Sequence, residues 1–231
     1  EGAEPASRLL RRLPLSWTPP PVPPDAPAPP TLYPSVQESE SGLTEFSPTG
    51  MLTRHIATVI HRWMRLMAAA AERSGRVCSP EQLHAQLPAM RTALAQLGVA
   101  PADLDSAARR VLDALCETLK DERGVWVLDP RHREAVSNLA VSGFYKGQII
   151  TSTIDRTFVD DEGVRWIIDF RAAVHEGSGV EQFLDAQLRV CQPELLRQAE
   201  LYRALSPGEK RPIRMGVYFP HLTAWREWVL E

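Results

Sequence analysis

The feature that most constrains the fold is a change in hydrophobic periodicity after Gly147. Before this residue the apolar side chains recur with a period near 3.6 residues. After it they alternate with a period of two and are mainly threonine, isoleucine, valine and aromatic residues. The pattern predicts a β-hairpin with strands from about Gln148 to Val159 and from about Val164 to Ala173, joined by the turn sequence Asp160-Asp161-Glu162-Gly163.

Helices and one further strand are predicted around this hairpin from capping signals and apolar spacing. The predicted helices cover about 51–73, 79–98, 102–120, the stretch from Asp129-Pro130 to just before Gly143, and about 181–205, and a short strand covers Ile213 to Phe219. This order gives an α/β class. We expect a mixed sheet, formed by the antiparallel hairpin plus an added strand, flanked by helices and preceded by an N-terminal helical portion.

Proline dominates the start of the chain, where ten of the 20 prolines lie between Pro14 and Pro34. Because proline lacks a backbone donor and favours extended conformations, residues 1 to 48 are interpreted as a linker. An alternative is a proline-rich ligand for an adaptor domain. The folded part is then 49–231, with a helical portion at 49–140 and an α/β core at 141–231. As the sequence starts at Glu1 without methionine, we expect it to be a piece of a longer protein.

Composition narrows the class of protein. The net charge of −3 gives no general attraction to a polyanion, so any contact with nucleic acid has to be local. Three widely spaced cysteines favour neither a disulfide framework nor a zinc site, which suggests a reducing, cytoplasmic location. No apolar run reaches the roughly 18 residues of a membrane span, and no signal peptide is recognisable, so no membrane association is expected.

The hairpin turn decides which side chains meet across the two strands. If Gly163 takes the left-handed position of a three-residue loop with a bulge, Asp160 pairs with Val164. The same register then sets Asp155 opposite Asp169. Two carboxylates therefore share one face of the sheet, where their mutual repulsion has to be relieved by a proton or a cation.

Alternation along the second strand adds Arg171 to the face that carries Asp155 and Asp169. The opposite face points into a core and carries Trp166, Ile168 and Phe170. A tighter turn would instead place Ile168 opposite Asp155. With the first register the pair of carboxylates is suited to Mg²⁺, which prefers hard oxygen ligands and keeps positions for water and a substrate phosphate.

The same stretch resembles a known family. The run TSTIDRTFVDDEGVRWIIDFR resembles the hairpin of the PD-(D/E)XK nucleases, in the branch found at the C-terminus of RecB-like and AddA-like bacterial helicases of the UvrD/Rep superfamily. The string RHIATVIHRWM resembles the family's G-x-x-x-H-R-x-L element, and GVYFPHLTAWREW resembles its closing strand. The resemblance covers about residues 50–231 and implies a restriction-endonuclease-like core.

The resemblance also implies a set of site residues. Asp155 and Asp169 match the family's metal ligands, and His61 and the backbone carbonyl of Phe170 join them around Mg²⁺ or Mn²⁺. Arg171 stands where the family has a catalytic lysine. The implied activity is that of a DNA exonuclease domain in an ATP-dependent helicase-nuclease that acts in repair and recombination of double-strand breaks. The implied partners are DNA, the helicase portion of the same parent chain and a second helicase-nuclease subunit.

The sequence departs from the family at several positions. Arginine stays protonated, so Arg171 can hold a phosphate but cannot take a proton from water. Ala57 replaces a usual glycine, and Asn138 stands where a glutamate is common. These departures motivate an alternative function, in which an impaired nuclease fold serves as a DNA-binding or partner-docking module. Taken without the flanking match, the spacing of Asp155, Asp169 and Arg171 would indicate only a solvated hairpin face with a surface ion pair.

Accessory residues are less well defined. Gln198 and Tyr202 match the family's Q-x-x-x-Y pair and would share one helix face toward DNA or the catalytic centre. A gapless alignment selects Glu194 and Gln198 instead. Arg62 is a candidate for a contact with DNA phosphate, although scattered arginines on a helix are usually its solvated side. Similarly, His61 considered alone is more typical of a partly buried histidine than of a ligand.

Overall fold

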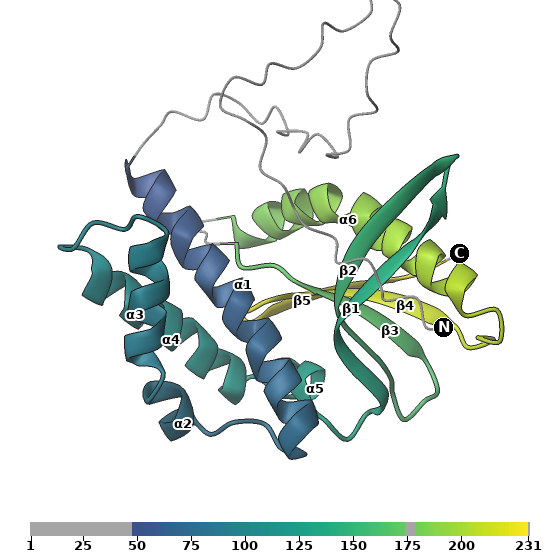
Figure 1. Cartoon of the computed structure of the whole chain (residues 1–231), viewed down its shortest axis with the longest axis horizontal. Helices are drawn as coiled ribbons and strands as arrows, with labels where there is room; N and C mark the ends of the chain where they lie inside the picture. Colours follow the sequence, from purple (N-terminus) through teal and green to yellow (C-terminus); the bar gives the residue numbers. More distant parts are fainter. Residues whose placement is uncertain (1–47, 174–178, 231) are drawn as a thin grey trace, which may run out of the picture. The chain divides into compact units, whose positions relative to one another are not determined.

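The computed structural model describes residues 48–173 and 179–230, and confirms the α/β class. The predicted linker, residues 1–48, lies outside this part of the chain except for its last residue. The elements are α1 (Pro48–Ser74), α2 (Pro80–His84), α3 (Leu87–Gln96), α4 (Leu104–Lys120), α5 (Glu122–Leu128), β1 (Arg133–Tyr145), β2 (Gln148–Val159), β3 (Arg165–Phe170), α6 (Val180–Leu205), β4 (Ile213–Phe219) and β5 (Ala224–Val229) (Figure 1).

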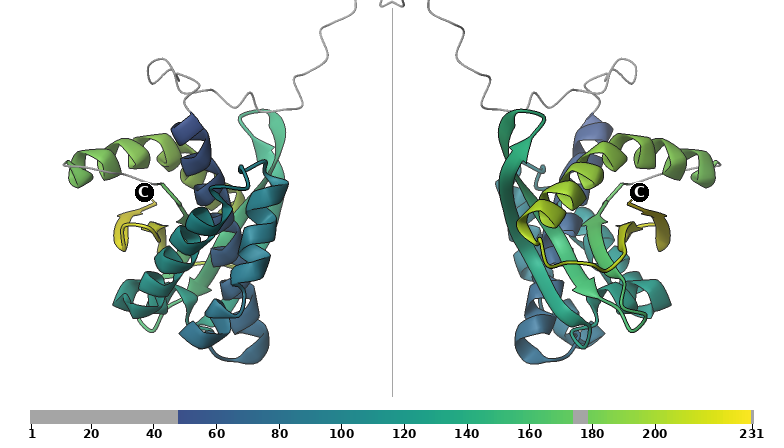
Figure 2. Two further views of the ribbon diagram at one scale, coloured as in Figure 1. Left: turned by 90° about the vertical axis from the view of Figure 1, so that its left-hand side faces the viewer. Right: turned by 90° about the vertical axis from the view of Figure 1, so that its right-hand side faces the viewer.

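The strands form one mixed sheet in the order β1-β2-β3-β4-β5. Neighbouring strands are antiparallel except for β3 and β4, which are parallel. A parallel pair requires a crossover connection, and α6 lies between these two strands in the chain. The β1–β2 hairpin extends beyond the other strands, because β2 pairs with β3 only from Arg156 onward (Figures 1 and 2).

Two apolar cores cover the two faces of the sheet. Alternate residues of β3 separate them: Ile168 belongs to the core shared with α1–α5, and Ile167 belongs to the core shared with α6. In β4 the same alternation holds for Tyr218 and Val217. The fold therefore has helices on both sides of the strands, with α6 on the side away from α1 (Figure 2).

The helical part follows its capping signals closely. Ser79 caps α2 in a capping box with Gln82, as predicted, and Gly98 follows α3 with a φ of 90°. The single helix expected over 79–98 is instead divided into α2 and α3. Pro88 in the first turn of α3 explains the break, because proline cannot continue a preceding helix.

The prediction of a helix from Asp129-Pro130 to just before Gly143 is wrong. This stretch forms β1, so the helical portion expected to reach residue 140 ends with α5, which was not predicted. Asp129 has an extended backbone, as residues before proline prefer, and its carboxylate accepts a hydrogen bond from the Arg131 N–H. The Asp-Pro pair therefore starts a turn rather than a helix.

The central hairpin has the predicted register. Gly163 has a φ of 82°, and the Asp160 N–H donates to the Val164 carbonyl over 3.0 Å. Pairs from Val159↔Arg165 to Arg156↔Ile168 keep one register, in which Asp155 and Asp169 are the next partners. The tighter alternative, with Ile168 opposite Asp155, is wrong. Also as expected, Trp166, Ile168 and Phe170 are buried in the core shared with α1–α5.

Across 48–173 and 179–230, none of the helices combines the length and apolar character that a membrane crossing requires.

Candidate metal centre

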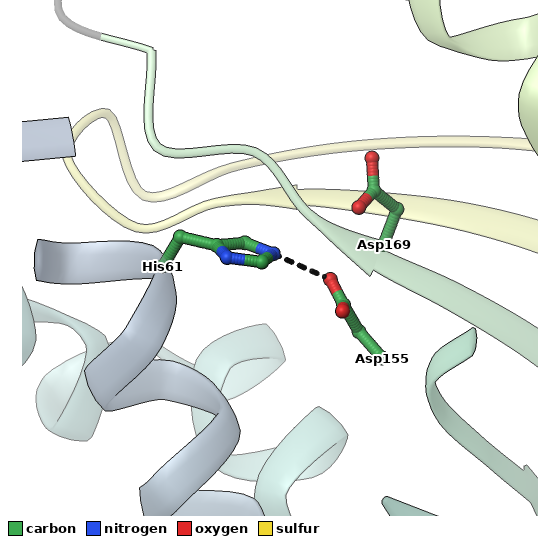
Figure 3. A group of neighbouring side chains, drawn as sticks. All are labelled: His61, Asp155 and Asp169. Carbon is green, nitrogen blue, oxygen red and sulfur yellow. Dashed lines mark hydrogen bonds and ion pairs between the residues drawn. The ribbon is translucent and has the colours of Figure 1, made fainter. Parts of the chain in front are cut away.

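Three side chains from different elements converge at one end of the β2–β3 ladder. His61 comes from α1, Asp155 from β2 and Asp169 from β3. One ligand atom from each lies within 4.8 Å of the other two. His61 Nε2 and Asp155 Oδ2 are 2.9 Å apart, and Asp169 lies beside this pair (Figure 3). The fold therefore brings together the three side chains that the resemblance implied as metal ligands.

The end of the ladder fixes the orientation of Asp155. Backbone pairing of β2 with β3 reaches Arg156↔Ile168, and beyond it the Phe170 N–H donates to Asp155 Oδ2 over 3.0 Å. The Asp155 carboxylate thus accepts a backbone N–H of β3 at the point where the backbone pairing of β2 with β3 ends. Its side chain is only 6% exposed. Because one oxygen accepts from both His61 and Phe170, rotation of this carboxylate is restricted.

The two carboxylates have opposite pKa shifts. Burial by itself would raise the pKa of Asp155, but the hydrogen bonds from His61 and the Phe170 N–H hold it below the usual value. Burial raises the pKa of Asp169 to about 6, and the nearby Asp155 adds to this rise while Arg171 opposes it. The negative charge of Asp169 is therefore the less well compensated of the two.

Two arginines flank the carboxylates. Arg171 Nε lies 3.0 Å from Asp169 Oδ2, and alternation predicted that these two residues share one face of the sheet. Arg65 Nε lies 3.4 Å from Asp155 Oδ1 and also donates to the side-chain oxygen of Asn138 on β1. Asn138 therefore holds an arginine at the position where the family often has a glutamate.

The chemistry of the group suits a divalent ion. Ligand atoms around Mg²⁺ are about 3 Å apart when adjacent and about 4 Å apart when opposite, since its bonds are about 2.1 Å long. The ligand atoms of His61, Asp155 and Asp169 lie within 4.8 Å of one another, so a bound ion would have to draw them together. The imidazole suits Mn²⁺ better than Mg²⁺, whereas carboxylates suit both. We therefore expect Mn²⁺ to bind the more tightly.

The accessory residues selected from the sequence do not join this group. Gln198 is buried and donates through Nε2 to Ser152 Oγ over 3.1 Å and to the Thr153 carbonyl over 3.2 Å. The Tyr202 ring faces the guanidinium of Arg165 at 5.3 Å. These contacts attach α6 to β2 and β3, so both residues take part in packing between the helix and the sheet.

The remaining candidates have similarly structural contacts. Glu194, from the gapless alignment, accepts a hydrogen bond from Ser152 Oγ over 2.7 Å. Arg62 is exposed and its guanidinium lies 5.9 Å from the ring centre of the neighbouring Trp63. The Phe170 backbone is drawn to the site by its N–H contact with Asp155, and its carbonyl stays a predicted ligand.

Two residues beside the site were given no binding role from the sequence. Arg65 follows His61 by four residues, so the helical spacing that puts both on one face of α1 could have identified it. Asn138 was noted only as a departure from the family's glutamate, and its contact with Arg65 was not predicted because it lies in the stretch that was expected to be helical. Its φ of 57° is in the left-handed region, which asparagine tolerates better than most residues.

Comparison of the chain with models of known protein families, and with curated proteins, gave no match.

Proposed function

We propose that this chain is a divalent-metal-dependent DNA nuclease domain that belongs to a cytoplasmic helicase-nuclease. The observation that carries the proposal is the convergence of Asp155 and Asp169 with His61 at the end of the β2–β3 ladder. A buried carboxylate and a partly buried one that lie close together are unfavourable without a cation. DNA is proposed as the substrate because the surrounding sequence resembles the PD-(D/E)XK nucleases. The same resemblance suggests the helicase part and a second subunit as partners.

The chemistry divides between the ion and the protein. A bound Mg²⁺ or Mn²⁺ supplies charge at the scissile phosphate and lowers the pKa of a bound water. His61, Asp155 and Asp169 would hold the ion, with the Phe170 carbonyl as the additional ligand. Arg171 would hold the phosphate. As a guanidinium stays protonated, Arg171 contributes charge and orientation and does not act as a base.

The experiment that tests this function is release of nucleotides from linear DNA in the presence of Mn²⁺ or Mg²⁺. We expect cleavage by the wild type, loss of cleavage with a chelator, and loss in Asp169→Asn. Asp161→Asn is the matched control, because it removes an exposed carboxylate from the turn of the same hairpin. Cleavage that persists in Asp169→Asn would exclude the assignment.

One observation favours a second function, an impaired nuclease fold that holds DNA or docks a partner. Arg171 replaces the expected lysine and is paired with Asp169 at 3.0 Å. Arg171→Lys discriminates between the two functions. A large gain in cleavage would mean that only this group limits an otherwise competent site. Absence of cleavage in both proteins, with DNA binding insensitive to chelator, would favour the holding role.

A further inference from the structure

The position of Arg65 suggests a role beyond that of a helix-surface arginine. It lies one turn after His61 on α1, and among the described residues both of its polar contacts are made by Nε, to Asp155 Oδ1 and to Asn138. A guanidinium carries five N–H donors in a planar fork. The fork formed by the two terminal nitrogens therefore remains to bind something else, and the side chain is 33% exposed.

The two carboxylates of the site are each matched by one arginine. Arg65 lies against Asp155, and Arg171 lies against Asp169. With no ion bound, the two guanidinium groups offset the formal charge of the two carboxylates, although the carboxylates still repel each other at short range. A divalent ion that occupies the carboxylates adds two positive charges to a small, partly buried volume, and an anion is then needed for balance.

A metal ion and Arg65 also compete for the same carboxylate. Asp155 Oδ2 faces His61 and Oδ1 faces Arg65, so an ion bound through this side chain weakens the attraction that holds the arginine. Asn138 provides a second, uncharged anchor on the Nε side. Arg65 can therefore lose its ionic partner and stay close to the site.

We propose that Arg65 is a second phosphate-binding residue, held against Asp155 as an internal counter-ion and transferred to a DNA phosphate when a divalent ion binds. This inference rests on the proposed nuclease function. Arginine pairs with phosphate through two parallel hydrogen bonds. Because the ion releases Arg65 from Asp155 and the released guanidinium binds DNA, metal binding and DNA binding are coupled. The coupling is reciprocal, so DNA tightens the ion as much as the ion tightens DNA.

Calorimetric titration with Mn²⁺ alone tests the counter-ion role. Arg65→Met keeps the aliphatic stem and removes the competing charge, so we expect Mn²⁺ to bind on the order of 5-fold more tightly than to the wild type. Arg73→Met is the matched control, because it removes the same charge from an exposed position farther along α1. Thermal melts of both variants verify that they are folded.

Binding of a single-stranded oligodeoxynucleotide, with and without Mn²⁺, tests the transfer. We expect Mn²⁺ to strengthen binding by the wild type on the order of 10-fold, and to do so far less in Arg65→Met. Unchanged Mn²⁺ affinity or undiminished coupling in Arg65→Met overturns this inference alone. If the wild type binds no Mn²⁺, both this inference and the proposed function are overturned.

Discussion

Two buried aspartates lie at opposite ends of the β2–β3 ladder and have different surroundings. Asp160, beside the turn, accepts hydrogen bonds from the Val164 N–H over 2.8 Å and from Trp166 Nε1 over 2.7 Å. Asp155, at the other end, faces His61 and a second carboxylate, Asp169. The two residues are similarly buried, with exposed fractions of 9% and 5%.

The difference lies in what satisfies each charge. Uncharged donors meet both oxygens of Asp160, and the turn that they close is the one that sets the register. The charges of Asp155 and Asp169 repel, and the pKa of Asp169 rises as a result of burial and of this neighbour. Burial of a carboxylate thus stabilises the fold at one end of the ladder. At the other end it stores an unfavourable interaction that a cation can relieve.

The largest effect is expected from Asp155→Ala on metal binding. Loss of one of the three side-chain ligands should weaken Mn²⁺ binding more than about 1000-fold, because changes to residues that merely orient ligands already cost 10- to 100-fold. Calorimetry of wild type and variant measures the change directly. Asp160→Ala is the comparison, and we expect it to keep its Mn²⁺ affinity. Equal loss of affinity in both would mean that the two ends of the ladder do not differ in the way described.

The converse effect is expected for folding stability. Asp160→Ala leaves the Val164 N–H and Trp166 Nε1 buried without acceptors, at a cost of about 1–3 kcal/mol each. We expect the free energy of unfolding to fall by about 3 kcal/mol in urea titrations. Asp161→Ala, an exposed neighbour in the same turn, should change it by less than about 0.5 kcal/mol. A small effect of Asp160→Ala on the free energy of unfolding would contradict the conclusion that buried Asp160 stabilises the fold.

This hairpin is also the part of the fold that sequence predicts best. The bounds of β2 and β4 match the expected ranges, and the register follows from Gly163 and alternation, because these signals are local. The second strand of the hairpin is shorter than expected and spans Arg165–Phe170. β1 was not predicted, because its alanine and leucine content also suits a helix and the two-residue turn Lys146-Gly147 that joins it to β2 was not recognised as a hairpin signal.

The same limit applies to the site. Asp155 and Asp169 are neighbours through a turn that can be read from the sequence, and His61 joins them through resemblance. The contact of Arg65 with Asn138 depends on how β1 passes α1, which no local pattern encodes. Conversely, the i, i+4 spacing of Gln198 and Tyr202 is shared by DNA-facing and layer-packing pairs, and only tertiary contacts separate these alternatives.

Asp169→Asn should stabilise the protein when metal is absent. The pKa of Asp169 is raised to about 6, so the folded state favours the protonated carboxyl, and wild-type stability falls as pH rises from about 4 to 6. Asparagine removes this penalty. We expect a gain on the order of 2 kcal/mol at pH 8 that disappears below about pH 4, measured by urea unfolding with chelator. Mn²⁺ should stabilise the wild type and not the variant. A loss of stability in Asp169→Asn at pH 8 would contradict the proposed repulsion between the carboxylates of Asp155 and Asp169.

The smallest effect is expected from a change in the turn itself. It tests whether the turn end and the metal-site end of the β2–β3 ladder are energetically independent. Gly163→Ala places a Cβ in open space, but at a φ of 82° that alanine rarely adopts. We expect a loss of about 1 kcal/mol in the free energy of unfolding, with no change in Mn²⁺ affinity. Gly208→Ala, which also meets nothing within 4 Å and has no positive φ, should be neutral. Because the register is set at the turn, weaker Mn²⁺ binding in Gly163→Ala would show instead that strain there is transmitted along the ladder to Asp155 and Asp169.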